Sequence, residues 1–297
     1  RALAPVEAAI ANWRGFVGAR QGWARLKALI LAMPDSPSAD MLPPPDKLME
    51  AEDVTLGPPG TDRLTVQGVK FGLRAGEGLA ILGPSGCGKS TLVRGLAGIW
   101  PLKSGAVRLD NADITQWPPD TLGRYIGYLP QNVELIAGTV AENIARFDPD
   151  AISEQVIKAA KLAGVHDLIL HLPDGYNSQV GPDGRALSGG QRQRIGLARA
   201  LYGDPFLIIL DEPNSNLDAQ GEEALASAIA DVRARGAIVI AVAHRPSLLA
   251  SVDLVLLMKD GKSIAFGPKE KLVGHLLPDP RQARPEAARP DQKVTAA

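Results

Sequence analysis

Residues 79–91 have the sequence LAILGPSGCGKST, and this stretch decides the fold. Its first four residues are apolar and predict a buried strand, while the following KSTLVRGLAG has a helical pattern. Between them lie two glycines five positions apart, followed by Lys and Ser, which is the spacing of a phosphate-binding loop. The stretch therefore predicts a parallel α/β sheet with a phosphate at a helix N-terminus. The alternative is a glycine-rich turn without a ligand.

The residue types of this loop suit a nucleotide with magnesium. Glycines allow successive backbone N–H groups to face the phosphates, and the helix N-terminus adds positive potential. We expect Lys89 to reach the outer phosphates, Ser90 to bind magnesium and Thr91 to place a hydroxyl near the α-phosphate. The rest of the expected nucleotide-binding loop consists of Gly83, Pro84, Ser85, Gly86, Cys87 and Gly88.

A second strand, FLIILDEP at residues 206–213, ends in two carboxylates. Asp211 is expected to hold the magnesium shell that a phosphate-loop enzyme requires. Glu212 would lie next to the outer phosphate, where it could polarise a water as a general base. The alternative is that the acid pair only caps the strand. Gln131 and His244 each follow an apolar run as well, and their order relative to Lys89 and Asp211 favours the same site over ordinary loop residues.

Composition limits the function classes. The 297 residues include 32 basic and 33 acidic ones, so the net charge of -1 gives no field that favours nucleic acid or an anionic membrane. Cys87 is the single cysteine, which excludes an internal disulfide and suits a reducing compartment. No apolar run reaches the roughly 18 residues of a spanning helix. We expect one large α/β domain with extensions.

The pattern along the chain suggests where the extensions lie. Residues 1–33 have apolar residues at near-helical spacing with arginines between them, which predicts an amphipathic helix that needs a partner surface. The proline-rich residues 34–47 predict an extended linker, and 278–297 a tail without a fold. Residues 48–277 alternate strand and helix patterns, with a mostly helical part at about 132–203 and a turn at Asp260-Gly261. Since the sequence begins with Arg1 rather than Met, we expect a carboxyl-terminal part of a longer protein.

A second glycine pair lies in RALSGGQRQR, residues 185–194. Ser188 and Gln191 have the spacing of a capping box, and a well-capped helix is one explanation. However, Gly189 and Gly190 cost backbone entropy and bury no side chain, which suggests that a phosphate approaches the backbone closely. A loop cannot easily share its own phosphate with a helix from a distant insert. A second copy of the chain, facing the other way, could place its own glycine pair against the phosphate bound by the first copy.

In its ordered motifs the chain resembles the ATP-binding cassette ATPases over about residues 48–277. The motifs are the phosphate loop (Walker A), Gln131 (Q-loop), LSGGQ at 187–191 (signature), LIILDE ending at Glu212 (Walker B), SNLD from Ser215 (D-loop) and His244 (H-loop). The resemblance implies an α/β P-loop NTPase with a RecA-like core, an antiparallel β subdomain and a helical subdomain. It also implies ATPase activity with ATP and Mg²⁺.

In that family two cassettes pair head to tail, and each ATP lies between the Walker motifs of one and the signature of the other. The resemblance implies that Glu212 and His244 are catalytic, with His244 holding the γ-phosphate, and that Gln131 senses magnesium and couples to a membrane domain. Magnesium would be held by Ser90, Gln131 and, through water, Asp211. The signature residues acting on the partner's nucleotide would be Leu187, Ser188, Gly189, Gly190 and Gln191. The D-loop residues would be Ser215, Asn216, Leu217 and Asp218.

Two stretches depart from the family pattern. Family members usually stack an aromatic residue on adenine, but VTLGPPGTDRL at residues 54–64 has none. We expect proline faces or Leu56 to substitute, with weak discrimination between ATP and GTP. The second stretch is SQVGPDG at 178–184, where exporters usually have Thr-Glu-Val-Gly-Glu-x-Gly. Its contact with a membrane domain is therefore expected to be less acidic.

The subfamily is indicated by LDEPNSNLD, AHRPS and the GDP before the Walker B strand. These resemble type I secretion ATPases of the protease and glycine-repeat (RTX) exporter kind. The resemblance implies an ATP-hydrolysing domain that powers polypeptide export, at the cytoplasmic face of the inner membrane. Residues 1–33 would then be the cytoplasmic end of the last transmembrane helix; the alternative is a helix that docks on the cassette.

Several partners and alternatives follow from this resemblance. The implied partners are a second cassette, its own or a partner's transmembrane domain, a membrane fusion protein, an outer-membrane channel and the exported polypeptide, with no nucleic acid. One alternative is an exporter ATPase for lipids, peptides or drugs. Less favoured are a soluble cassette for DNA repair or translation and a cassette that binds ATP without hydrolysing it.

Overall fold

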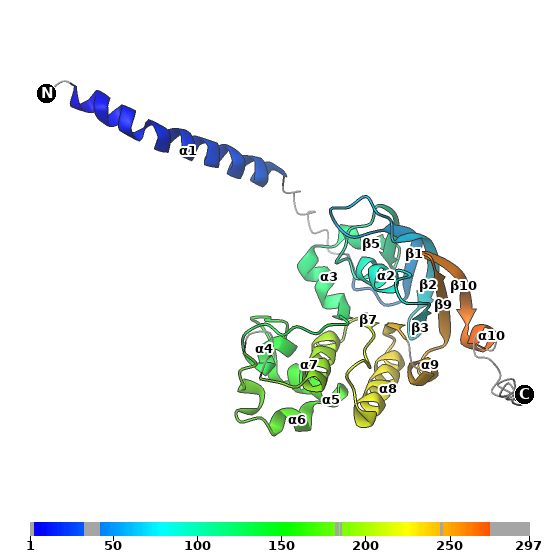
Figure 1. Cartoon of the computed structure of the whole chain (residues 1–297). Coiled ribbons are helices and arrows are strands. Elements are labelled where there is room, and N and C mark those ends of the chain that lie inside the picture. Colours follow the sequence, from blue (N-terminus) through cyan, green and yellow to red (C-terminus); the bar gives the residue numbers. More distant parts are fainter. Residues whose placement is uncertain (1–2, 33–41, 182–183, 185, 244–245, 274–297) are drawn as a thin grey trace, which may run out of the picture. The chain divides into compact units, whose positions relative to one another are not determined.

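A computed structural model of the protein describes residues 3–32, 42–181, 184, 186–243 and 246–273 (Figure 1). The chain divides into two units, residues 1–41 and 42–297. The first contains the helix α1, Ala4–Ala32, on which Trp13, Phe16 and Trp23 are exposed. Within the part of the chain that the structure describes, no helix has both the length and the apolar character needed to cross a membrane. The predicted tail at 278–297 and much of the predicted linker lie outside the described residues.

The second unit is built on a parallel sheet. Among the described residues this sheet has six strands in the order β10-β9-β3-β8-β7-β6, all parallel except β10. The strands are β3 Gly78–Leu82, β6 Ile126–Leu129, β7 Leu207–Asp211, β8 Ile238–Val242, β9 Leu254–Lys259 and β10 Lys262–Pro268. Every residue of β7 and β8 is buried, which explains their continuous apolar sequences. The predicted parallel α/β core is thus confirmed.

An antiparallel sheet packs beside this core. Its order within the described chain is β2-β1-β4-β5, with β1 Leu48–Leu56, β2 Val66–Arg74, β4 Ser104–Leu109 and β5 Ala112–Asp113. Phe71 of β2 and Phe266 of β10 bring the two sheets together, with ring centroids 5.9 Å apart. Asp260 and Gly261 both have left-handed backbones, with φ of 49° and 78°, at the turn between β9 and β10. The predicted hairpin turn is therefore present.

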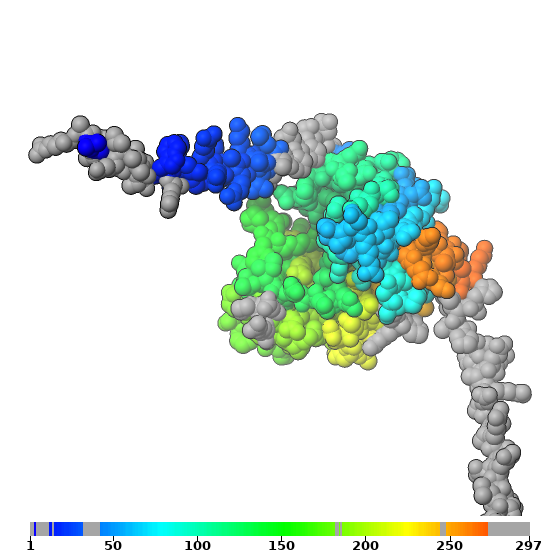
Figure 2. Space-filling view, turned by 45° about the horizontal axis from the view of Figure 1, so that its top comes forward, coloured from blue at the N-terminus to red at the C-terminus, as the bar shows by residue number. Residues whose placement is uncertain are grey.

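The helices divide between the core and an insert between β6 and β7. Helices α4 to α7 form the insert with the short helix η2, and Figure 2 shows its green residues as a lobe of the cassette surface. The remaining helices belong to the core and the antiparallel sheet. The bounds are α2 Lys89–Leu96, α3 Pro119–Tyr125, α4 Val140–Ile144, α5 Ser153–Leu162, α6 His166–Leu170, α7 Gly189–Leu201, α8 Ala219–Ala234, α9 Pro246–Ala250, α10 Lys269–Val273, η1 Ile114–Gln116 and η2 Gly175–Asn177.

Helix α7 joins the insert to the sheet. It packs against α4 and α5 of the insert and against β6 of the sheet. Two glycines make the contact with the β6 region close: a Cβ on Gly127 would lie 2.0 Å from the carbonyl oxygen of Ala200, and one on Gly196 would lie 2.7 Å from Val133. Because neither position has room for a methyl group, α7 is held at a fixed distance from the sheet.

We predict that Gly127→Ala destabilises the protein by about 1–3 kcal/mol, since the new methyl group would overlap a backbone carbonyl that cannot rotate away. Thermal unfolding should then occur about 2–4 °C lower for each kcal/mol. Gly123→Ala is the matched control, because no described atom lies within 4 Å of its would-be Cβ and it lies in helix α3. Equal melting temperatures for the two variants would contradict the close packing of α7 on β6.

Candidate functional site

The predicted phosphate loop connects β3 to α2 and closes around the side chain of Lys89. Gly88 caps the helix with a left-handed φ of 100°, and a Cβ there would lie 2.9 Å from the carbonyl oxygen of Thr65. Only glycine satisfies both conditions. The Lys89 ammonium donates hydrogen bonds to the carbonyl oxygens of Gly83 and Pro84, both at 2.9 Å. Its positive charge is thereby placed at the loop, beside the N-terminus of α2.

The hydroxyl of Ser90 links this loop to the end of β7. It donates a hydrogen bond of 3.1 Å to Oδ1 of Asp211, whose side chain is fully buried. The other oxygen, Oδ2, has no hydrogen-bond partner among the described residues. Burial raises the pKa of Asp211 above its usual range; the bond from Ser90 opposes this rise, and the negative charge of Glu212 adds to it.

Magnesium fits this arrangement. The ion prefers oxygen ligands and is commonly bound by one or two protein groups, with phosphate oxygens and water completing its shell. A hydroxyl and a buried carboxylate with one unbonded oxygen provide such groups. The described residues contain no cluster of three or more His, Cys, Asp or Glu side chains that could hold a metal without a nucleotide.

Gln131 and Glu212 meet at the same edge of the sheet. Leu129 of β6 pairs in register with Leu210 of β7, so Gln131 and Glu212 each follow two residues after a paired position. Nε2 of Gln131 donates a hydrogen bond of 2.9 Å to Oε2 of Glu212. Glu212 also has a left-handed backbone with φ of 52°, a conformation that non-glycine residues adopt at a cost and that recurs at functional sites. Parallel register thus brings together two groups that are 81 positions apart.

The carboxyl edge of the sheet therefore gathers most of the predicted catalytic and nucleotide-binding residues. The phosphate loop follows β3, Asp211 and Glu212 end β7, and Gln131 follows β6. His244 comes two positions after β8, which lies between β3 and β7, but it is outside the described residues. Its role remains a prediction.

Ser188 begins helix α7 as its N-cap. Its hydroxyl accepts a hydrogen bond of 3.2 Å from the backbone N–H of Gln191, and the Gln191 side-chain oxygen accepts one of 2.8 Å from the Ser188 N–H. The predicted capping box is confirmed. A Cβ on Gly190 would lie 3.1 Å from the carbonyl oxygen of Asn216, whereas the nearest described atom to one on Gly189 lies at 4.0 Å. Close packing against Asn216 therefore also favours glycine at position 190, and this constraint was not predicted from the sequence.

The start of α7 is tied to the predicted D-loop and to the residues just before it by two side chains that were not predicted from the sequence. Arg194 lies 2.5 Å from Oδ1 of Asp218, and the buried Gln193 donates a hydrogen bond of 3.1 Å to the carbonyl oxygen of Pro213. Asp218 also caps α8, and the N–H of Gly221 followed by the charge of Arg194 lowers its pKa. The signature helix and the D-loop therefore form one connected unit.

The loop that would receive adenine lies between β1 and β2. The expectation that Leu56 contacts the base is wrong, because Leu56 is fully buried and packs against Gly95 of α2. Pro58 in this loop is half-buried and keeps an apolar face accessible, and the N–H of Thr65 closes the loop on the carbonyl oxygen of Leu56 at 3.0 Å. Since the Thr65 carbonyl lies at Gly88, the loop adjoins the start of α2.

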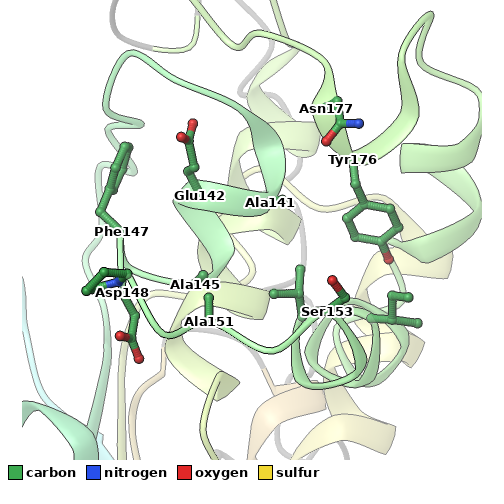
Figure 3. A pocket seen from close by; sticks show the side chains of 12 residues that line it. Ala141, Glu142, Ala145, Phe147, Asp148, Ala151, Ser153, Tyr176 and Asn177 are labelled. Carbon is green, nitrogen blue, oxygen red and sulfur yellow. The ribbon is translucent and has the colours of Figure 1, made fainter.

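A separate cavity of about 550 Å³ lies in the helical insert (Figure 3). Phe147 and Tyr176 are on opposite sides of it, and Glu142 projects from α4. The cavity includes none of the predicted Walker, signature or D-loop residues. The cavity is therefore not part of the predicted nucleotide site.

Comparison with known proteins agrees with these motifs. The family model described as ABC transporter matches residues 66–215. The chain is 58% identical over 277 residues to the type I secretion system ATP-binding protein PrsD of Rhizobium meliloti (strain 1021), covering 93% of this chain and 48% of that protein. It is 40% identical over 211 residues to ATP-binding cassette sub-family B member 6 of Homo sapiens, covering 71% of this chain and 25% of that one.

A solved structure shares the fold. The structure of a bacterial Atm1-family ABC exporter with ATP bound matches with a TM-score of 0.80 and 30% sequence identity, over 91% of this chain and 48% of the other. The chain thus spans about half the length of PrsD and of this structure, and a quarter of the human relative. The predicted P-loop NTPase fold is confirmed by these matches.

We predict opposite effects of Asp211→Asn on stability and on magnesium binding. The raised pKa means that the ionised carboxylate is less stable in the folded chain than in the unfolded one, so at neutral pH the neutral amide should raise the melting temperature. The extra stabilisation that Mg²⁺ adds to bound ATP should disappear. Thermal shift with ATP, with and without Mg²⁺, measures both effects. Asp120→Asn, an exposed change, is the control; retention of the Mg²⁺ effect in Asp211→Asn would contradict the metal role.

We predict that Pro58→Tyr tightens ATP binding about fivefold, because a tyrosine ring would add roughly 1 kcal/mol of stacking on the base. Pro59→Tyr, at the exposed neighbouring proline, should change little. The unchanged chain should bind ATP and GTP with affinities within a few-fold of each other. Titration with both nucleotides measures this, and a large preference of the unchanged chain for ATP would contradict Pro58 as the contact with the base.

Proposed function

Because the chain belongs to the ABC transporter ATPase family, we propose that it is the ATP-hydrolysing domain of a type I secretion exporter, which moves polypeptides across the inner membrane. The observation that carries the proposal is the 58% identity to PrsD, which extends over 93% of the chain and not only over the motifs. Relatives of other kinds share about 40% identity over about 70% of the chain, so they support this function less.

The site supports hydrolysis through distinct roles for its residues. Lys89 would neutralise the outer phosphates, and Glu212 would take a proton from the attacking water. Gln131, now bonded to Glu212, would turn towards the metal shell with Ser90 and Asp211. Magnesium, when bound, supplies charge neutralisation on the phosphates. His244 would hold the γ-phosphate.

The second half of the site would come from another copy of the chain. The Ser188 hydroxyl and Gly189 lie at the start of α7, where the helix dipole and free N–H groups favour an anion. The open space around Gly189 gives a phosphate room to approach, while Gly190 packs against the D-loop. We infer a head-to-tail pair in which the D-loop lies close to the shared nucleotide.

The remaining parts of the proposal concern the whole exporter. The pair would lie at the cytoplasmic face of the inner membrane and drive a transmembrane domain. A membrane fusion protein and an outer-membrane channel would continue the export path. The exported polypeptide would be of the protease or glycine-repeat class.

We predict that Glu212→Gln lowers ATP turnover at least about 100-fold, because an amide cannot accept the proton of the attacking water. ATP binding should persist, so the ATP-bound pair should accumulate. Phosphate release measures turnover, and sedimentation with ATP and Mg²⁺ measures pairing. Glu154→Gln, an exposed change on α5, should behave like the unchanged chain. Full turnover in Glu212→Gln would remove Glu212 from the catalytic role.

The same variant tests the secretion assignment. Residues 48–273 would replace the matching part of PrsD, and export of its polypeptide substrate into the medium would be measured. We expect the chimera to secrete and its Glu212→Gln form not to. A chimera that reaches the membrane and hydrolyses ATP without secreting would contradict the assignment to type I secretion.

A further inference from the structure

Two residues that follow the C-cap of α4 have an unusual backbone. Arg146 and Phe147 both adopt left-handed conformations, with φ of 58° and 57°. Each such non-glycine residue costs roughly 1–2 kcal/mol, so contacts of the side chains must hold the turn. Phe147 lines the cavity in Figure 3, whereas Arg146 bonds to backbone of α3, β6 and α7. The turn thus directs the Phe147 side chain to the cavity and the Arg146 side chain to the backbone of neighbouring elements.

The Arg146 guanidinium donates to five backbone carbonyl oxygens. Three belong to the end of α7 and two to the junction of α3 and β6. They are those of Arg199 at 2.9 Å, Ala200 at 3.2 Å and Tyr202 at 3.2 Å, together with those of Ile126 at 3.3 Å and Gly123. This fork of donors cannot be reproduced by a lysine, whose three donors lie on one atom.

Three of these carbonyls, those of Arg199, Ala200 and Gly123, belong to the last turns of α7 and α3, where a helix leaves its carbonyls without intrahelical partners, and the other two follow directly after the helices. Helix α7 ends at Leu201 and α3 at Tyr125, and the negative ends of both helix dipoles lie at these oxygens. Burial, together with the neighbouring charge of Arg199, lowers the pKa of Arg146 to about 10. The guanidinium therefore remains charged at neutral pH and serves as a shared cap for two helices.

The other end of α7 carries the signature. The helix has 13 residues and is therefore about 20 Å long, with Ser188 at its N-terminus. Close packing on β6 through Gly127 and Gly196 prevents the helix from sliding sideways. Under this restraint, the position of the last turn determines where the first turn is presented.

We propose that Arg146 is a positioning residue for hydrolysis of the ATP bound by the partner copy. It holds the last turn of α7 and thereby sets the place of Ser188 and Gly189 at the shared site. The inference rests on the paired cassettes of the proposed function. It assigns to Arg146 an effect on the partner's nucleotide and none on ATP binding by its own copy.

The first test compares Arg146→Lys with Arg199→Lys in the whole chain. Arg199 is a matched control on α7, since among the described residues its side chain donates a single hydrogen bond, to the carbonyl oxygen of Glu134 at 3.0 Å. We expect Arg146→Lys to bind ATP normally but to lose at least tenfold in turnover, and Arg199→Lys to lose less than twofold. Arg146→Gln is the second variant, in case Arg146→Lys does not fold. Normal turnover, or loss of ATP binding in both Arg146 variants, would overturn the proposal.

The second test mixes two variants, so that a mixed pair of copies contains one nucleotide site with both halves intact. Arg146→Lys would supply the intact Walker motifs, and a Lys89→Ala copy, which cannot hold the phosphates, would supply the intact signature. Each variant alone should have at least tenfold lower turnover than the unchanged chain. Their mixture should recover the same fraction of activity as a calibration mixture of Ser188→Arg with Lys89→Ala.

The outcomes separate the inference from the proposed function. Recovery in the calibration mixture without recovery in the Arg146 mixture would show that Arg146 acts within its own copy, and would overturn the positioning role alone. Failure of both mixtures would contradict the shared site itself, and the inference would fall with it. Recovery in both mixtures is the result that supports it.

Discussion

The site depends on a carboxylate that the fold removes completely from water. Asp211 is the last residue of an entirely buried strand, and the hydroxyl of Ser90 satisfies only one of its oxygens. Burying an ionised carboxylate is costly unless other groups compensate it. The strands on either side hold it there, while α2 brings the serine that partly compensates it. The sheet is thus built around a cost to stability that a bound cation would offset.

Local patterns were sufficient to predict the parts of this site that depend on residue type and spacing. The glycine loop between β3 and α2, the capping box at Ser188 and the turn at Asp260 each depend on residues within a few positions of one another. The assignment of Gln131 to the same site as Asp211 was also predicted from the order of the motifs, whereas its hydrogen bond to Glu212 became visible only with the parallel pairing of β6 and β7. The predicted features could be recognised because their chemistry depends on which side chains are present and how they are spaced.

Most of the features that were missed depend on backbone atoms or on register shifts. The Arg146 contacts use carbonyl oxygens, which every residue possesses, so no sequence pattern marks its five acceptors. Leu56 was misassigned because the β1 pairing shifts between Ala51 and Val54, which changes the alternation of inward and outward positions. Asp53 has a left-handed φ of 47° at that irregularity. Only the three-dimensional pairing shows which face Leu56 occupies.

The contact between the signature helix and the D-loop has a consequence for the evolution of the two segments. Gly190 meets the backbone of Asn216, Gln193 the carbonyl of Pro213, and Arg194 the carboxylate of Asp218. A change in either segment therefore alters the surface on which the other rests. Mutations in the two segments should be accepted during evolution as compensating pairs, so that descendants of this chain vary them together and the two motifs act as a single unit of selection.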